Sequence, residues 1–159
     1  MRPTDPVLLT QLAAIYAHQA NLSGSPENIR LAYDAYEQAI TLAPTLGLIN
    51  QQYADLALRT GDIETARRQA QRAVDLDATD GVAFGILGWA QLQTGNLTAA
   101  QSAFAQAVRW QPDSADFYLG LATVHFQQED FEAARQAVEA SLVRDPSYAP
   151  AVALQAQLP

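Results

Sequence analysis

The amino-acid sequence predicts an all-α fold, a solenoid of stacked helix pairs that repeats every 34 residues. Three observations lead to this prediction: a residue pattern that recurs, apolar stripes at helical spacing, and glycine and proline at the ends of the expected helices. The recurrence is clearest between two copies, which pair Leu87 with Leu121, Gly95 with Glu129, Ala100 with Ala134, and Pro112 with Pro146.

Residues 81–114 show how one copy would form two packed helices. Apolar or small residues at helical spacing mark one stripe on each helix: Phe84, Leu87 and Gly88 on the first, and Ala100, Phe104 and Ala107 on the second. Because the glycine and the alanines are small, the two helices can approach closely while the phenylalanines fill the space beside the contact. One such pair buries little alone, so the pairs must stack.

Glycine and proline mark the helix ends. Gly61 and Gly95 suit the left-handed residue that ends a first helix. Pro44, Pro112 and Pro146 lack the N–H group that a continuing helix needs, so each marks the end of a second helix.

This pattern resembles the tetratricopeptide repeat over almost the whole chain, and the resemblance implies a right-handed superhelix of antiparallel helix pairs. It places residues 1–159 in a single domain. The expected divisions are repeat 1 at 6–46 with a seven-residue insertion, repeat 2 at 47–80, repeat 3 at 81–114, repeat 4 at 115–148, and a partial C-terminal helix at 149–159.

Four residues depart from the family pattern. Asn50 stands where the family has a large apolar residue, and Ala70 where it has an aromatic one, so repeat 2 is expected to pack least tightly. Glu129 replaces the turn glycine of repeat 4, and His125 replaces a common tyrosine; the fold should tolerate both.

The insertion of repeat 1 lies between Ala17 and Asn28. Ser25 suits the N-cap of a helix, with Pro26 at its first position and Glu27 near its positive end. The insertion therefore predicts either a longer turn or an extended first helix. After Tyr148, residues 149–158 begin a fifth first helix, which would belong to a longer array, pair with another molecule, or form a short apolar lid.

Composition excludes several functional classes. The chain has 17 carboxylates against 9 arginines and no lysine, and its formal net charge of -8 disfavours nucleic acid as a partner. No apolar run is long enough to insert this segment into a membrane. Residues 1–10 show no signal peptide, which favours a cytoplasmic location, although the chain could be a piece of a longer protein.

No constellation of residues indicates an enzyme, a cofactor or a metal site. The two histidines, His18 and His125, lie too far apart for one metal ion; we expect the first to be solvated and the second to be a partly buried packing residue. Scattered carboxylates are interpreted as a solvated face, and Gly81, Gly85 and Gly88 as helix-packing positions.

The resemblance implies a partner-binding groove on the concave face, lined by the first helix of each pair. The corresponding residues are Leu48, Gln51, Asp55, Leu58 and Arg59 in repeat 2, Val82, Gly85, Trp89, Leu92 and Gln93 in repeat 3, and Asp116, Leu119, Thr123, Phe126 and Gln127 in repeat 4. Five of them would form an exposed apolar patch: Val82, Trp89, Leu92, Leu119 and Phe126. Trp89 is the expected anchor, with room for an inserted group beside Gly85.

Alternative readings stay open for several of these residues. Leu92 and Phe126 could instead pack against the next first helix, and Trp110 is expected to pack between repeats. Some relatives bind acidic C-terminal tails through basic residues in the groove; the matching positions here, Gln51, Gln52, Asp55, Val82 and Ile86, disfavour such a ligand. The basic run Arg67, Arg68 and Arg72 is interpreted as a solvated convex face, with Glu64 pairing with Arg68.

The leading hypothesis is a non-enzymatic protein-interaction scaffold whose partner is another protein or peptide with an apolar or amphipathic segment. A second hypothesis is a structural unit that self-associates through its repeat ends, above all the C-terminal one. A third is an accessory domain of a larger bacterial membrane protein or enzyme.

Overall fold

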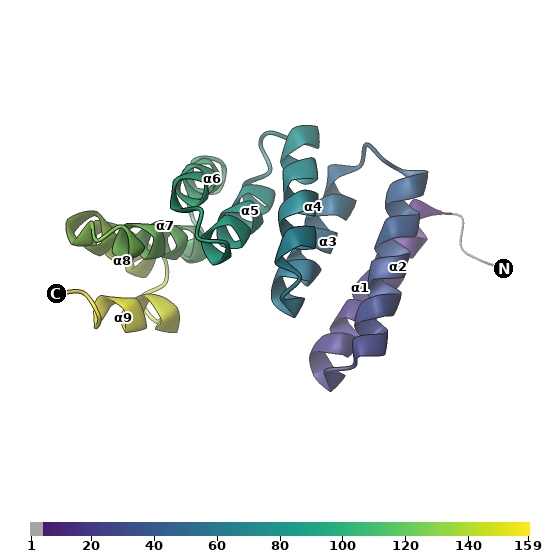
Figure 1. The fold of residues 1–159 in the computed structure, drawn as a ribbon, viewed down its shortest axis with the longest axis horizontal. Coiled ribbons are helices and arrows are strands. Elements are labelled where there is room, and N and C mark those ends of the chain that lie inside the picture. The colour runs from purple at the N-terminus through teal and green to yellow at the C-terminus, as the bar shows by residue number, and fades with distance from the viewer. Residues whose placement is uncertain (1–4) are drawn as a thin grey trace. The chain divides into compact units, whose positions relative to one another are not determined.

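The computed structural model describes residues 5–159, and every regular element in that range is an α-helix (Figure 1). The helices are α1 Pro6–Ser23, α2 Pro26–Leu42, α3 Gly47–Thr60, α4 Ile63–Leu76, α5 Gly81–Gln93, α6 Leu97–Trp110, α7 Ala115–Gln127, α8 Phe131–Arg144 and α9 Ala149–Gln155. The first eight form four pairs joined by short turns, as the 34-residue pattern predicts.

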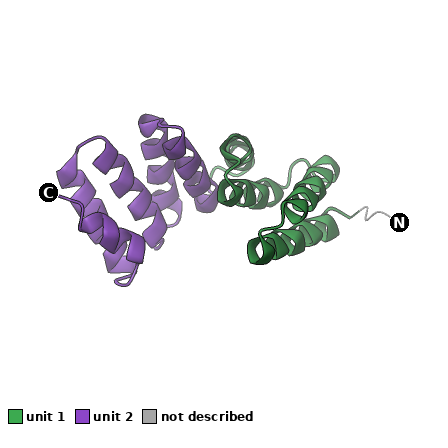
Figure 2. Ribbon diagram, turned by 60° about the horizontal axis from the view of Figure 1, so that its bottom comes forward, with its two compact units in different colours: residues 1–78 green, residues 79–159 purple. Residues whose placement is uncertain are grey.

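The chain divides into two compact units, residues 1–78 and residues 79–159 (Figure 2). Unit 1 contains α1 to α4 and unit 2 contains α5 to α9. Residues 1–4 of the expected single domain lie outside the described residues. The expectation that the whole chain forms a single repeat domain stays a prediction.

Unit 1 is held together by an alanine-rich core with three tyrosines at its centre. Small buried residues of α1 and α2, such as Ala13 and Ala32, let these helices approach closely. The rings of Tyr36 and Tyr53 stack with centroids 5.4 Å apart, and Tyr33 meets Tyr53 edge to face at 4.9 Å. These aromatic contacts join α2 to α3 and so connect the first helix pair to the second.

The seven-residue insertion lengthens both helices of the first pair. Helices α1 and α2 have 18 and 17 residues, whereas α3 and α4 have 14 each, so the excess is 4 plus 3 residues. Each excess is close to one helical turn of about 3.6 residues, and the apolar stripe therefore stays on the same face. Of the two expected alternatives, the extended helix is correct, and the second helix is extended as well.

The turns within the pairs share one backbone conformation. Gly24, Gly61 and Gly95 have φ angles of 64°, 81° and 75°, in the left-handed region that glycine adopts without steric cost. Glu129 occupies the same position in the fourth pair with φ 62°. The fold thus tolerates a side chain there, as expected, but with a strained backbone. Ser25 is the N-cap of α2, also as expected.

The core of unit 2 forms around Phe104 of α6, which has no exposed surface. A Cβ atom added to Gly88 would lie 2.8 Å from this ring, and one added to Gly120 would lie 2.3 Å from it. The ring therefore lies in a space that exists because α5 and α7 each carry a glycine beside it. Burial of such a side chain contributes about 1.5–3 kcal/mol.

Helix α9 covers the last pair of unit 2. Ala151 is fully buried and Leu154 is 8% exposed, and both join a core cluster with Leu119 and Val138. The backbone carbonyl of Pro159 accepts a hydrogen bond from the Arg135 guanidinium of α8 at 2.7 Å. The choice among the three expected roles for residues 149–158 stays a prediction, because α9 would pack in this way in each of them.

Asn50 and Trp110 differ in how far they are buried. Asn50 does occupy a core position, since it is 1% exposed, yet neither of its side-chain polar atoms has a hydrogen-bond partner. The expectation that Trp110 packs between repeats is wrong, because its side chain is 42% exposed. Trp110 is the last residue of α6, so its ring lies at the helix end, where the Arg109 guanidinium approaches it to 5.1 Å.

Candidate partner-binding face

The predicted groove residues of unit 2 are more enclosed than the sequence suggests. Leu92 and Leu119 are only 7% and 6% exposed, so the expectation of an exposed apolar patch is wrong for these two. Leu92 packs with Ala100, Phe104 and Val124 in the core, which is the alternative that the sequence left open for it.

The other members of the expected patch differ in exposure. Trp89 and Phe126 are half-buried, and Phe126 meets the ring of Phe131 edge to face at 5.9 Å. Val82 is 36% exposed, and the polar groove residues Gln93 and Gln127 are exposed. Unit 2 thus presents a mixed surface here, with Val82 as its most accessible apolar side chain among the predicted residues.

Gly85 makes room for a side chain of its own chain. A Cβ atom at Gly85 would lie 2.2 Å from the ring of Phe117, which comes from α7. The interpretation that Gly85 leaves space for an inserted ligand is therefore wrong. Its interpretation as a helix-packing position is confirmed, and Gly88 has the same role against Phe104.

Trp89 of α5, Asp116 of α7 and Tyr148, the N-cap of α9, form a hydrogen-bonded group in unit 2. The indole Nε1–H of Trp89 donates to Asp116 Oδ2 at 2.8 Å, and the Tyr148 hydroxyl donates to Asp116 Oδ1 at 2.8 Å. Burial and the hydrogen bond with the Asp116 carboxylate raise the pKa of Tyr148 to about 12. The indole ring also packs edge to face on Phe104, with centroids 5.1 Å apart.

Trp89 is therefore a structural residue in addition to any contact it makes with a partner. Only the part of the indole that faces neither Phe104 nor Asp116 remains available. A substitution of Trp89 would remove core packing and one hydrogen bond at the same time, so it cannot test partner binding without also changing stability.

In unit 1, a cavity of about 250 Å³ lies between the first helices of the two pairs. Its lining residues are Val7, Thr10, Gln11 and Ala14 of α1, Leu46 before α3, and Leu48, Ile49 and Gln52 of α3. Val7, Leu46 and Leu48 are 54%, 44% and 52% exposed, so the opening of the cavity is apolar. At its surface Gln52 Oε1 is a buried acceptor without a hydrogen-bond partner.

The cavity extends the predicted groove to α1, whose residues the sequence reasoning missed. Val7 and Leu48 are 41 residues apart, which equals the period of 34 plus the insertion of 7. They are therefore equivalent positions of two first helices. Correcting the period for the insertion would have added Val7, Thr10 and Ala14 to the expected groove.

The remaining predicted residues of repeat 2 are largely polar. The Asp55 carboxylate accepts an ion-pair hydrogen bond from Arg59 at 2.7 Å, and both side chains are about half exposed. Gln51 and Leu58 are half-buried on the same helix. Such an exposed pair contributes little to stability, so both partners are free to exchange bonds with a ligand.

The histidines behave as the sequence indicates. His18 is exposed, and the side chain of His125 is 19% exposed, with Nδ1 3.9 Å from the Asp130 carboxylate and no hydrogen bond. Within residues 5–159 no three histidine, aspartate or glutamate side chains gather in a way that could hold a metal ion. The helices of the same range include none that is long and apolar enough to cross a membrane.

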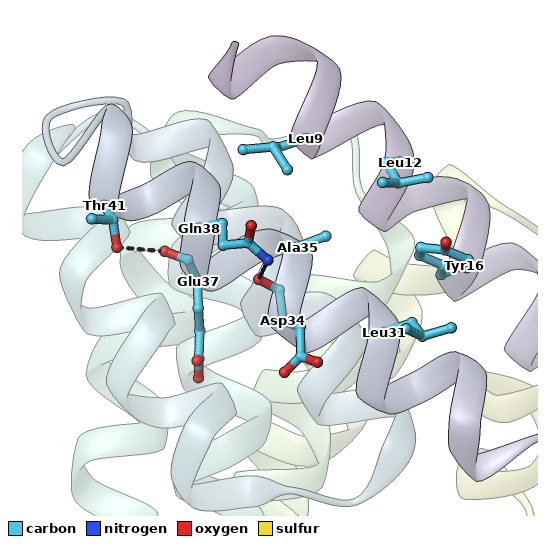
Figure 3. Close-up of a pocket in the computed structure, with 9 residues that line it drawn as sticks. All are labelled: Leu9, Leu12, Tyr16, Leu31, Asp34, Ala35, Glu37, Gln38 and Thr41. Carbon is cyan, nitrogen blue, oxygen red and sulfur yellow. Dashed lines mark hydrogen bonds between the residues drawn. The ribbon is translucent and has the colours of Figure 1, made fainter. Parts of the chain in front are cut away.

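A second cavity, of about 600 Å³, is lined by the two helices of the first pair (Figure 3). Its apolar wall comes from Leu9, Leu12 and Tyr16 of α1 with Leu31 of α2. Asp34, Glu37, Gln38 and Thr41 of α2 give it a polar side, where Figure 3 shows Thr41 and Gln38 bonded to backbone carbonyl groups of their own helix.

These features define the chain as a helical-repeat protein. Residues 53–100 and 87–149 match the family model of the tetratricopeptide repeat. Together the two ranges span more than half of the sequence, and the chain belongs to the tetratricopeptide-repeat family.

Solved structures share the fold at low sequence identity. PilF of Pseudomonas aeruginosa is 18% identical with a TM-score of 0.84, over 98% of this chain and 68% of its own. MamA is 21% identical with a TM-score of 0.80, over 94% and 80%. YrrB, described as a tetratricopeptide-repeat protein with an unusual peptide-binding site, is 20% identical with a TM-score of 0.73, over 93% and 84%. The predicted all-α solenoid fold is confirmed.

Proposed function

We propose that this chain is a non-enzymatic scaffold that binds an apolar or amphipathic segment of another protein on the first helices of its repeats. Family membership supports the general role, because tetratricopeptide-repeat proteins are in general protein-interaction modules. The proposal that an apolar segment binds on the first helices rests on the apolar cavity between α1 and α3, with its exposed leucines and valine. An exposed apolar opening of this kind commonly marks a partner site.

The cavity suits one side chain of a bound segment. Its volume of about 250 Å³ can hold an aliphatic or aromatic group, and the orphan acceptor Gln52 Oε1 can receive one N–H group from the partner. On the same helix, Gln51 and the Asp55–Arg59 pair supply polar groups beside the apolar opening. This combination fits an amphipathic helix or an extended peptide with a single apolar anchor.

The test compares a charge placed at the cavity with the same charge placed elsewhere. Leu48→Asp puts a carboxylate at the opening, and Leu48 is 52% exposed, so the fold should be kept. Val143→Asp is the matched control, because Val143 is 78% exposed on α8, a second helix. Peptides would be selected from a displayed library against the wild-type chain, and their affinities measured for all three proteins.

We expect the selected peptides to share an apolar anchor and to lose about tenfold or more in affinity with Leu48→Asp, but not with Val143→Asp. Equal binding by all three proteins, or a library that yields no peptide at all, would contradict the proposal. Circular dichroism of each variant establishes that the helices are intact.

A second candidate function, self-association through the repeat ends, is favoured by the cavity between α1 and α2. Leu12, Tyr16 and Leu31 line that cavity, and each of them is only partly buried. A second copy could cover these side chains with its α9 end, where Val152 is 47% exposed. Sedimentation equilibrium of the wild type and of Leu12→Asp decides between a monomer and a concentration-dependent oligomer.

A further inference from the structure

A polar cavity of about 350 Å³ is lined by residues of α2, α3 and α4 in unit 1 and shares no lining residue with the proposed peptide cavity. Ile40 of α2 and Pro44 after it form an apolar wall. Asn50 of α3 and the side chains Arg68 and Arg72 of α4 supply polar groups. The two arginines are one helical turn apart, so their guanidinium groups can converge on one ligand.

Asn50 is an unpartnered polar group at this cavity. It is 1% exposed, and both its Oδ1 and Nδ2 atoms are buried without a hydrogen bond. An orphan of this kind is destabilising, and the same position in the repeat pattern takes a large apolar residue. A ligand that bonds to the amide would satisfy it, and the long arginine side chains around it can change rotamer to admit one.

The two arginines have few partners of their own. Arg68 donates one long hydrogen bond of 3.4 Å to the Thr65 hydroxyl. No ion pair or hydrogen bond among residues 5–159 uses Arg72. Their neighbour Arg67 differs, because it pairs with Glu64 at 2.8 Å. The expected Glu64–Arg68 ion pair is therefore not formed, although the hydrogen bond from Arg67 and, to a smaller extent, the Arg68 charge lower the pKa of the Glu64 carboxyl.

One carboxylate, that of Asp75, also lines the cavity. Asp75 Oδ1 accepts a hydrogen bond of 2.9 Å from Gln71 Nε2, and no ion pair within residues 5–159 joins it to either arginine. Two cationic groups thus face one anionic group, in a chain whose net charge is -8. A local excess of positive charge in an acidic protein favours an anion.

We propose that this cavity binds an oxyanion, a carboxylate or phosphate group, through the guanidinium groups of Arg68 and Arg72 and the side-chain amide of Asn50. Guanidinium groups bind planar carboxylate and phosphate oxygens in a two-pronged manner, and the amide N–H adds a neutral donor. The site shares α3 with the proposed peptide cavity but none of its lining residues, so the two can be tested separately. Its failure would leave that proposal unchanged.

The experiment titrates isotope-labelled protein with sodium phosphate and, separately, with sodium acetate, against sodium chloride at equal ionic strength. The side-chain amide resonances of Asn50 and the Nε–H resonances of Arg68 and Arg72 are followed by NMR. We expect saturable shifts of these resonances with a dissociation constant of about 10 mM or tighter for at least one of the two anions. Saturation by acetate alone indicates a carboxylate ligand, and saturation by phosphate alone indicates a phosphate group.

Two variants separate a built site from general charge attraction. Arg72→Gln should weaken binding about tenfold, whereas Arg67→Gln, which removes the same charge from the same helix outside the cavity, should change it less than about twofold. Asn50→Leu should keep the fold and lose binding. The proposal is overturned if neither anion gives saturable shifts, if both arginine variants lose affinity equally, or if Asn50→Leu binds like the wild type.

Discussion

Replacing Gly120 by alanine tests whether the core of unit 2 depends on the glycine space around Phe104. The added Cβ would lie 2.3, 2.5 and 2.6 Å from three atoms of the Phe104 ring, whereas carbon atoms in contact are normally about 3.5–4 Å apart. The ring cannot retreat toward α5, because a Cβ at Gly88 would already be 2.8 Å from it. With no exposed surface, Phe104 also has no outlet to solvent.

Two opposing effects set the change in the free energy of unfolding that Gly120→Ala causes. Overpacking of a core costs about 1–3 kcal/mol, and contacts this short place Gly120→Ala at the upper end of that range. Alanine is better than glycine inside a helix by about 1 kcal/mol, and Gly120 lies within α7. The expected net effect is a loss of about 2 kcal/mol in the free energy of unfolding of unit 2.

Urea denaturation followed by circular dichroism measures the change, and hydrogen exchange of the α6 and α7 amides assigns it to unit 2. Gly47→Ala is the control, because a Cβ there would meet Leu76 at an ordinary 3.4 Å. Adding Phe104→Leu to Gly120→Ala should recover part of the loss, since the shorter side chain vacates the contested space. A Gly120→Ala protein that is more stable than the wild type would refute the steric reasoning.

Three further predictions concern other parts of the chain. Glu129→Gly should stabilise the protein by about 1 kcal/mol, because the residue has φ 62°; no gain in the urea midpoint would mean that the turn is unstrained. Asn50→Leu should raise or keep the free energy of unfolding, since it removes two buried unpartnered polar atoms; a loss above about 1 kcal/mol would show that a bound water or ligand satisfies them. The Tyr148 pKa of about 12 lies above the unfolded value of 10, so its contribution to stability is complete below pH 10 and is lost as the pH rises toward 12. Tyr148→Phe should make the fall in stability over that interval less steep, and an unchanged slope would argue against the raised pKa.

The sequence was sufficient to predict the helices because the signals that define them are local. Gly61, Gly95 and Pro112 end helices through their own backbone restrictions, whatever surrounds them. The stripe that contains Phe104 repeats at helical spacing and needs no knowledge of its neighbours. The repeat pattern also places the insertion between Ala17 and Asn28, although its division between two helices is not predictable from the pattern.

The candidate site was predicted less well, because exposure depends on contacts between distant residues. Leu92 and Leu119 occupy groove positions in the repeat pattern, but other helices of unit 2 cover them. The room expected beside Gly85 is filled by Phe117, which lies 32 residues further along the chain. The repeat pattern says which residue type stands at each position, but it does not say which distant side chain fills the space beside a glycine.

Trp89 shows why the two units need different tests of partner binding. In unit 2 the indole is bonded to Asp116 and packed on Phe104, so a lost interaction after Trp89→Ala would have two explanations. In unit 1 Leu48 is 52% exposed beside an open cavity, so its replacement changes the surface and leaves the core intact. Partner binding that depends on Leu48 but survives conservative changes at Trp89 would place the anchor on α1 and α3. The reverse dependence, with stability shown to be unchanged, would place it on α5 and α7.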